Sequence, residues 1–114
     1  MSVFLGQRTV GSITILEWGE HLRAENVSEF RNRLQHLAGK GQIHLLLDCS
    51  RLRIVDSQGI GSLVGNWVSL KKRGGKLGLL NPSSRLRDAL RLVGMHDHIE
   101  CFDDVGKALP TLAK

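Results

Sequence analysis

Residues 52–65 read Leu-Arg-Ile-Val-Asp-Ser-Gln-Gly-Ile-Gly-Ser-Leu-Val-Gly, and this stretch decides the fold. A nearly continuous apolar run, residues 43–47, ends just before it at Asp48. Beyond Ser57 apolar residues recur at helical spacing, namely Ile60, Leu63, Val64, Trp67 and Leu70. The pattern predicts a buried strand, a short loop and a helix that begins near Ser57 and ends near Arg73. A serine at such a position can cap the helix, hold an anion or receive a phosphate.

Strand-like and helical segments alternate along the rest of the chain. Strands are predicted at residues 10–18, 43–47, 76–80 and 99–102, with residues 3–5 as a short partner strand and 6–9 as its turn. Helices are predicted at residues 24–38 and 57–73, then after Asn81-Pro82-Ser83-Ser84 and after Asp103-Asp104. This order predicts one α/β domain over residues 1–114, with a mixed sheet of four to five strands. Central pairings are expected to be parallel, with the helices packed mainly on one face.

Finer patterns predict which side chains enter the core. Ile13 and Ile15 are expected on one face of their strand, with Thr14 and Leu16 on the other. In the third helix the core side is expected to carry Leu86, Leu90 and Val93, with Gly94 just past the end. Pro110 lies inside the last helical pattern and predicts a break or an early end.

Composition narrows the class of protein. The chain has 114 residues, 41% of them hydrophobic, which suits one globular domain. No apolar run approaches the roughly 20 residues of a membrane span, and the first residues lack a secretory signal pattern, so a cytoplasmic protein is expected. The net charge is +5, but the basic residues are spread over several predicted helices. Aromatic residues, on which bases could stack, are few, and both observations argue against nucleic-acid binding. Cys49 and Cys101 lack a CxxC spacing and are expected to be buried free thiols.

The predicted helix after Ser57 carries no charged residue as far as Leu70. Opposite its apolar stripe it carries Gln58, Ser62, Asn66 and Ser69, with Gly61 and Gly65 at the edge. Each glycine, including Gly59, costs about 1 kcal/mol of helix stability relative to alanine. Two explanations stay open: close packing of this helix on the strands, or an uncharged face to which another protein docks.

Other chemistry is poorly supported by the residues present. Ser57 lies in Val-Asp-Ser-Gln-Gly, which is not the G-x-S-x-G elbow of a hydrolase, and no histidine is tied to it by spacing. Gly59-Ile60-Gly61 lacks the later glycine of a dinucleotide motif. His96-Asp97-His98 is better explained as a solvated turn than as a metal site. We therefore expect no enzymatic activity, cofactor or metal.

From Asp56-Ser57-Gln58-Gly59-Ile60-Gly61, followed by Leu63, the chain resembles the STAS domain family, and in particular bacterial anti-sigma factor antagonists. The resemblance covers nearly the whole chain. It includes the apolar strand that ends at Asp48, then Gly74-Gly75 with the strand at 77–80, and the stretch from Asn81-Pro82 to Gly94.

The resemblance implies a mechanism. Ser57 is the expected phosphosite, and the kinase is also the anti-sigma factor, which binds ATP itself. The unphosphorylated form binds this partner and frees the sigma factor, and a serine phosphatase resets the phosphorylated form. The implied partner-binding residues are Asp56, Ser57, Gln58, Gly59, Gly61, Ser62, Gly65 and Asn66. A monomer that binds neither nucleic acid nor membrane is expected.

Two departures from the family pattern stand out. The family often has Gly-x-Leu-Asp after its second strand, whereas this chain has Gly19-Glu20-His21-Leu22-Arg23-Ala24, with an extra residue and Arg23 in place of the acid. Gln58 replaces the usual serine or threonine. Two alternatives remain: a STAS subunit of another complex without a phosphate cycle, such as a lipid-transport ABC system, or a small nucleotide or phosphate binder at the Ser57 helix.

Overall fold

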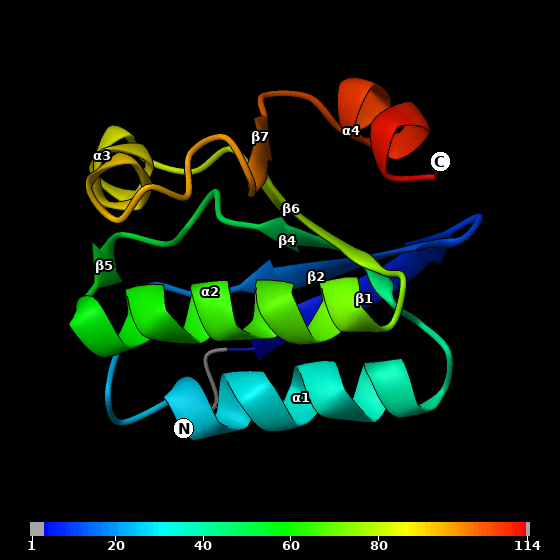
Figure 1. Ribbon diagram of the computed structural model, residues 1–114, viewed down its shortest axis with the longest axis horizontal. Coiled ribbons are helices and arrows are strands. Elements are labelled where there is room, and N and C mark those ends of the chain that lie inside the picture. Colours follow the sequence, from blue (N-terminus) through cyan, green and yellow to red (C-terminus); the bar gives the residue numbers. More distant parts are fainter. Residues whose placement is uncertain (1–3, 114) are drawn as a thin grey trace.

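The computed structural model describes residues 4–113, which form a five-stranded sheet, a separate two-stranded sheet and four helices (Figure 1). The strands are β1 Phe4–Val10, β2 Ile13–Trp18, β3 His21–Leu22, β4 His44–Asp48, β5 Ile54–Val55, β6 Lys76–Leu80 and β7 Glu100–Phe102. The helices are α1 Val27–Gly39, α2 Ser57–Lys72, α3 Ser84–Leu92 and α4 Val105–Leu112.

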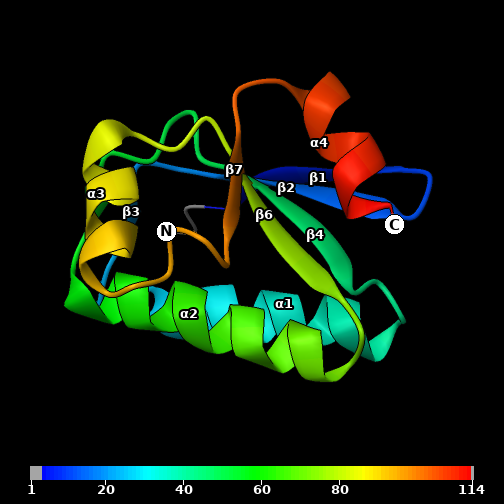
Figure 2. The ribbon, with the colours of Figure 1, turned by 45° about the horizontal axis from the view of Figure 1, so that its top comes forward.

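The large sheet has the order β1-β2-β4-β6-β7. Only the hairpin pair β1 and β2 is antiparallel, while β2, β4, β6 and β7 pair in parallel. Because the strand order advances in one direction and parallel crossovers are right-handed, α1, α2 and α3 fall on the same face. Helix α4 covers the opposite face, as the rotated view shows (Figure 2). The predicted α/β class, mixed sheet and unequal distribution of helices are confirmed.

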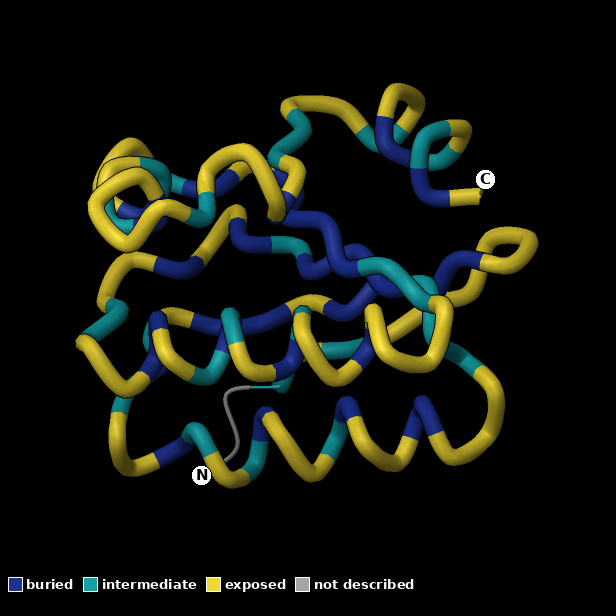
Figure 3. The backbone as a smooth tube through the Cα atoms, viewed as in Figure 1, coloured by how far each residue is buried: buried dark blue, intermediate teal, exposed yellow. Residues whose placement is uncertain are grey.

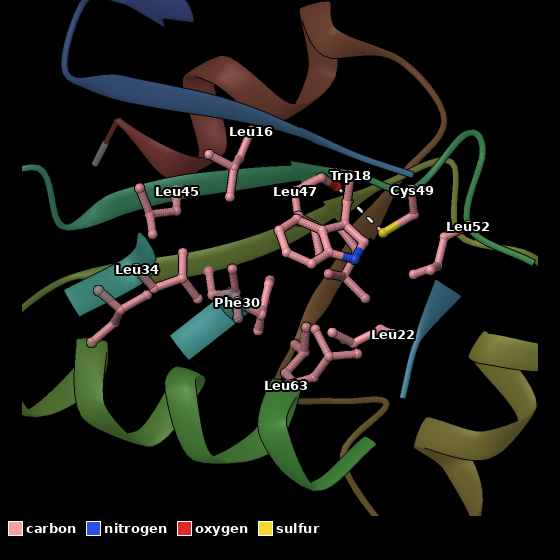
Figure 4. Close-up of a cluster of buried hydrophobic side chains, with 14 of the residues drawn as sticks. Leu16, Trp18, Leu22, Phe30, Leu34, Leu45, Leu47, Cys49, Leu52 and Leu63 are labelled. Atoms are coloured by element: carbon pink, nitrogen blue, oxygen red, sulfur yellow. Dashed lines mark hydrogen bonds between the residues drawn. The ribbon is translucent and has the colours of Figure 1, made fainter. Parts of the chain in front are cut away.

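Each face of the sheet has its own hydrophobic core. The smaller core joins Ile13, Ile15, Leu46 and Leu80 to Ala108 and Leu112 of α4. The larger one contains Leu16, Leu45 and Leu47 with residues of α1, α2 and α3 (Figure 4). Strand β4 is thus covered on both faces, as its continuous apolar run predicted. Along α1 and α2, each turn has a buried or half-buried side and an exposed side (Figure 3).

An aromatic pair anchors α1 to the sheet close to the start of α2. Trp18 and Phe30 meet edge to face, with ring centroids 5.1 Å apart. The Trp18 indole donates a hydrogen bond to the His21 carbonyl at 3.0 Å, which ties the end of β2 to β3. The arrangement satisfies the only polar atom of a fully buried tryptophan.

The two-stranded sheet fixes the entry into α2. Strands β3 and β5 pair in parallel, and the Arg53 and Ile54 amides both donate to the Glu20 carbonyl. The first turn of α2 lies so close to β3 that a Cβ at Gly59 would overlap the Leu22 carbonyl oxygen. Close packing on a strand therefore explains Gly59.

The N-terminal hairpin differs from the prediction. Residues 6–9 belong to β1 and pair with β2, and the turn lies at Gly11 and Ser12, with Gly11 at φ 60°. Most of β1 is exposed at the sheet edge, so its sequence lacks the alternation that marks a half-buried strand.

Three further predictions about the helices were wrong in detail. Val64 and Trp67 of the predicted stripe are only half-buried. Val93 is 53% exposed, because α3 ends at Leu92 and the chain then leaves the helical period. Helix α4 continues through Pro110 to Leu112. Pro110 removes one backbone bond near the helix end, where few bonds depend on it.

Candidate functional site

Asp56, and not Ser57, caps helix α2. Its backbone is extended, and its Oδ1 accepts a hydrogen bond from the Gly59 amide at 2.8 Å. Its Oδ2 accepts a second bond from the Ala24 amide at 3.1 Å. One carboxylate therefore satisfies an unpaired amide of the helix and fixes the loop that precedes α1.

These bonds favour the ionised carboxylate. The hydrogen bond from Gly59 is the main cause that lowers the pKa of Asp56 below its ordinary value, and the Ala24 and Gln58 amides and the charge of Arg23 act in the same direction. Desolvation opposes them without reversing the shift. Asp56 consequently carries a negative charge at neutral pH, directly beside Ser57.

The Ser57 side chain is left without a structural task. Ser57 is the first residue of α2 and is exposed. Its hydroxyl has no hydrogen-bond partner within residues 4–113. The sequence left open whether Ser57 or Asp56 caps the helix, and the structure assigns capping to Asp56.

A groove of about 350 Å³ runs between α1 and α2. The wall from α2 is uncharged and consists of Gln58, Ser62, Gly65, Asn66 and Ser69. The wall from α1 consists of Val27, Ser28, Arg31 and Gln35. The α2 wall is visible in the sequence as an uncharged helix side, whereas its neighbour α1 is not, because no local pattern shows which helices pack side by side.

The predicted docking residues occupy unequal positions. Gln58 and Gly61 are exposed, whereas Gly59 is buried against β3. Asn66 is only 7% exposed, and its amide donates to the Ser62 carbonyl at 2.7 Å and to the Ser62 hydroxyl at 3.2 Å. Asn66 thus forms the floor of the groove.

Gly61 and Gly65 are not explained by packing inside the chain. Apart from its chain neighbours and the backbone of α2 itself, a Cβ at either residue would meet no atom of residues 4–113 within 4 Å. Both are exposed, although glycine weakens a helix interior by about 1 kcal/mol relative to alanine. The face that they share with Gln58 and Ser62 therefore carries no charge, and at the two glycines it has no side chain that would keep another molecule away from the helix backbone.

Comparison with known proteins identifies the fold family. The model of the STAS domain family matches residues 7–108. The chain belongs to the STAS domain family. This STAS domain is 30% identical over 100 residues to the anti-sigma-B factor antagonist of Listeria monocytogenes, covering 88% of this chain and 87% of the relative.

Solved structures agree with the family assignment. A provisionally assigned anti-sigma factor antagonist of Thermotoga maritima superposes with a TM-score of 0.88 at 22% identity, covering 96% of this chain and 94% of that one. The Bacillus cell fate determinant SpoIIAA in its phosphorylated form gives a TM-score of 0.75 at 21% identity, covering 95% and 97% of the two chains. At these identities the likeness describes the fold.

Arg23 lies in the loop that Asp56 ties to the start of α2. Its backbone amide donates to the Asn26 side chain at 2.8 Å, and its Nε lies 2.6 Å from a Glu25 carboxylate oxygen. Because Ala24 bonds to Asp56, Arg23 sits next to the capped start of α2. An Arg23–Glu25 ion pair therefore lies beside the start of α2, and the charge of Arg23 contributes to the lowered pKa of Asp56.

The remaining candidates offer little chemistry. His96 lies 3.4 Å from Asp97, and the His98 ring packs near Trp67. Within residues 4–113 no three histidine, cysteine or acidic side chains come together in a way that could hold a metal ion. Cys49 is buried as predicted, whereas Cys101 is only half-buried. Within the same residues no helix is both long and apolar enough to cross a membrane.

Proposed function

We propose that this STAS domain is an anti-sigma factor antagonist whose binding is switched by phosphorylation of Ser57. In this proposal the unphosphorylated chain binds an anti-sigma factor that is also a serine kinase, and the sigma factor is released. The 30% identity to an anti-sigma-B factor antagonist over most of both chains supports the regulatory class. No enzymatic activity or cofactor of its own is required, and the chain acts as a monomer.

The observation that carries the proposal is the division of roles between Asp56 and Ser57. Asp56 makes the structural hydrogen bonds, and the Ser57 hydroxyl is exposed and unengaged within the described residues. A kinase can therefore approach Ser57 without opening the fold. The Ser57 oxygen attacks the γ-phosphorus of ATP bound to the kinase, ADP leaves, and the hydroxyl proton passes to a base of the kinase.

The phosphate acts on the interface and leaves the fold in place. It adds a charge of about −1.5 to −2, which the positive end of the helix dipole tolerates. On the partner side, however, that anion stands on a face that is otherwise uncharged from Gln58 to Ser69. The ionised Asp56 adds to the negative field, and Arg23 offsets part of it. The phosphorylated chain is then released, and a serine phosphatase restores the free hydroxyl by hydrolysis.

The partner face consists of the exposed start of α2 and the α1–α2 groove. Asp56, Ser57, Gln58 and Gly61 present the switch, while Ser62, Gly65 and Asn66 border or line the groove. Gly59 contributes indirectly, because it holds this turn against β3.

The decisive experiment is intact-mass measurement of the protein purified from its native cells. We expect one added phosphate that maps to Ser57 and is absent from a Ser57→Ala variant. A chain that never carries the phosphate, but still co-purifies with a complex, would favour docking without a phosphate cycle. Titration with ATP and GTP tests nucleotide binding: amide shifts confined to residues 57–61 would contradict the proposal.

A further inference from the structure

Strand β5 and helix α3 lie on the side of the molecule where α2 begins (Figures 1 and 2). Two hollows with shared lining residues lie there, beside the start of α3. The larger, about 430 Å³, lies over the loop after β4 and the start of α3, and includes Ser50 and Asn81. The smaller, about 130 Å³, reaches Ile54 and Val55, the strand that leads into Asp56. Both are lined by Arg53, Ser83 and Arg85, so they form one trough. We call it the arginine trough, defined by Arg53, Ile54, Ser83 and Arg85.

The arginine trough carries two cations without an internal counter-ion. Arg53 and Arg85 are exposed, and within residues 4–113 neither forms an ion pair. The other arginines of α3 are paired, Arg87 with Asp103 at 3.0 Å and Arg91 with Asp88 at 3.4 Å.

Asp48, the acidic residue at the end of β4, already accepts hydrogen bonds within the chain. Asp48 Oδ1 accepts hydrogen bonds from the Ser50 hydroxyl at 2.6 Å and from the Ser50 amide at 3.0 Å. Asn81 donates to the same Ser50 hydroxyl at 3.2 Å, and Ser83 accepts from the Leu86 amide at 3.1 Å. These polar side chains are therefore hydrogen-bonded to one another or to the backbone, whereas the two exposed guanidinium groups are available to an external anion.

An apolar residue lies beside these charges. Ile54 is 50% exposed, and it separates Arg53 from the Val55-Asp56-Ser57 stretch. A small inorganic anion would use the arginines and leave Ile54 in water. A peptide segment that carries both carboxylates and an apolar side chain fits all of these groups.

We propose that the arginine trough receives an acidic segment of the protein that docks at Ser57. Charge complementarity selects carboxylates, because guanidinium groups bind them through paired hydrogen bonds. Because β5 connects the trough to the start of α2, one protein that docks at Ser57 can also reach the trough. The inference rests on the proposed function only for the identity of the protein that supplies the segment.

The first test uses the isolated full chain with hexaglutamate as probe, at low salt. We expect amide NMR shifts at residues 53–54 and 83–85. The double variant Arg53→Gln/Arg85→Gln should weaken binding by about tenfold, since both charge-assisted contacts are lost. The control Arg8→Gln/Arg91→Gln removes the same charge outside the trough and should bind as the wild type does. Equal binding by the trough variant and the wild type overturns the inference, as do equal shifts with inorganic phosphate alone.

The second test uses the anti-sigma factor kinase. The trough variant should bind it about tenfold more weakly than the control variant does, and the difference should shrink as salt is raised. A kinase that binds both variants equally overturns the inference and leaves the proposed function standing. If no anti-sigma factor binds the wild type, the proposed function fails, and the hexaglutamate titration decides the inference by itself.

Discussion

The Oδ2 atom of Asp56 lies 3.1 Å from the amide nitrogen of Ala24, a residue 32 positions earlier in the chain. This bond connects the loop that carries Arg23 to the helix start that carries Ser57. The other carboxylate oxygen is held by Gly59, so Asp56 fixes the positions of both segments at once.

We expect the substitution Asp56→Asn to destabilise the fold in a pH-dependent way. The pKa of Asp56 in the folded state is below its ordinary value of 3.8, so the folded state binds its proton less readily than the unfolded state. The resulting stability is fully present above pH 3.8 and is lost as pH falls through the lowered pKa. Urea unfolding of wild type and variant should show a difference that shrinks on acidification. The variant Asp97→Asn, in an exposed turn, controls for the loss of a surface carboxylate.

Ser57→Asp should weaken binding of the anti-sigma factor kinase by at least about tenfold, because a second negative charge is placed beside the ionised Asp56, at the start of an α2 face that is otherwise uncharged. The free energy of unfolding should change by no more than about 0.5 kcal/mol, as for an exposed residue without partners. Ser12→Asp adds the same charge in the β1–β2 turn and should leave binding unchanged. Calorimetric titration and thermal unfolding measure the two quantities. A large loss of stability with intact binding would contradict the switch.

Gly59→Ala should destabilise the fold by roughly 1–3 kcal/mol, the usual range for overpacking. The added Cβ would overlap the Leu22 carbonyl and press on Val55, and both lie in the small sheet that positions α2. Urea unfolding provides the measurement. A variant as stable as the wild type would mean that α2 does not rest directly on β3.

Gly61→Ala and Gly65→Ala should behave in the opposite way. Each should raise the free energy of unfolding by about 1 kcal/mol, because the Cβ meets open space and alanine favours the helix. Each should also weaken partner binding if another protein approaches this face closely. For stability, Gly59→Ala provides the contrast within the same helix, because its Cβ meets the Leu22 carbonyl oxygen and not open space. A gain in stability with unchanged affinity would refute the close-approach explanation of these glycines.

The two thiols should react with a disulfide reagent at different rates. Burial, the largest cause in both cases, raises the pKa of Cys49 and of Cys101. Cys49 is completely enclosed, with its sulfur 3.5 Å from the Leu47 carbonyl oxygen, whereas Cys101 is half-buried. Titration of the native protein should therefore modify Cys101 first, and Cys101→Ser should remove this phase. Equally fast modification of Cys49 would reveal opening of the loop after β4.

Long, periodic segments could be predicted from the sequence, and short or exposed ones could not. Strand β4 is covered on both faces, so its apolar run is unambiguous. Strands β3 and β5 have two residues each, which is too short for any period to be visible. Strand β1 is exposed at the sheet edge, and Gly6 in its middle was interpreted as part of a turn.

Only the part of the candidate site that lies on a single long helix could be predicted from the sequence. The uncharged side of α2 is a property of one helix and can be identified from spacing alone. The partnership of α1 with α2, which buries Asn66 and creates the groove, depends on the order of strands β2, β4 and β6. The arginine trough likewise joins Arg53 and Arg85, which are 32 positions apart, and scattered arginines in the sequence do not indicate it.

The capping role of Asp56 has a consequence for how this protein can change over generations. Because the carboxylate of Asp56 holds the helix start, position 57 contributes little to folding, and under the proposed function it is constrained mainly by the switch. A single codon change there can remove or restore the proposed phosphorylation site in a lineage while the domain stays folded. The neighbouring position lacks that freedom, since most replacements of Asp56 would alter folding and signalling together.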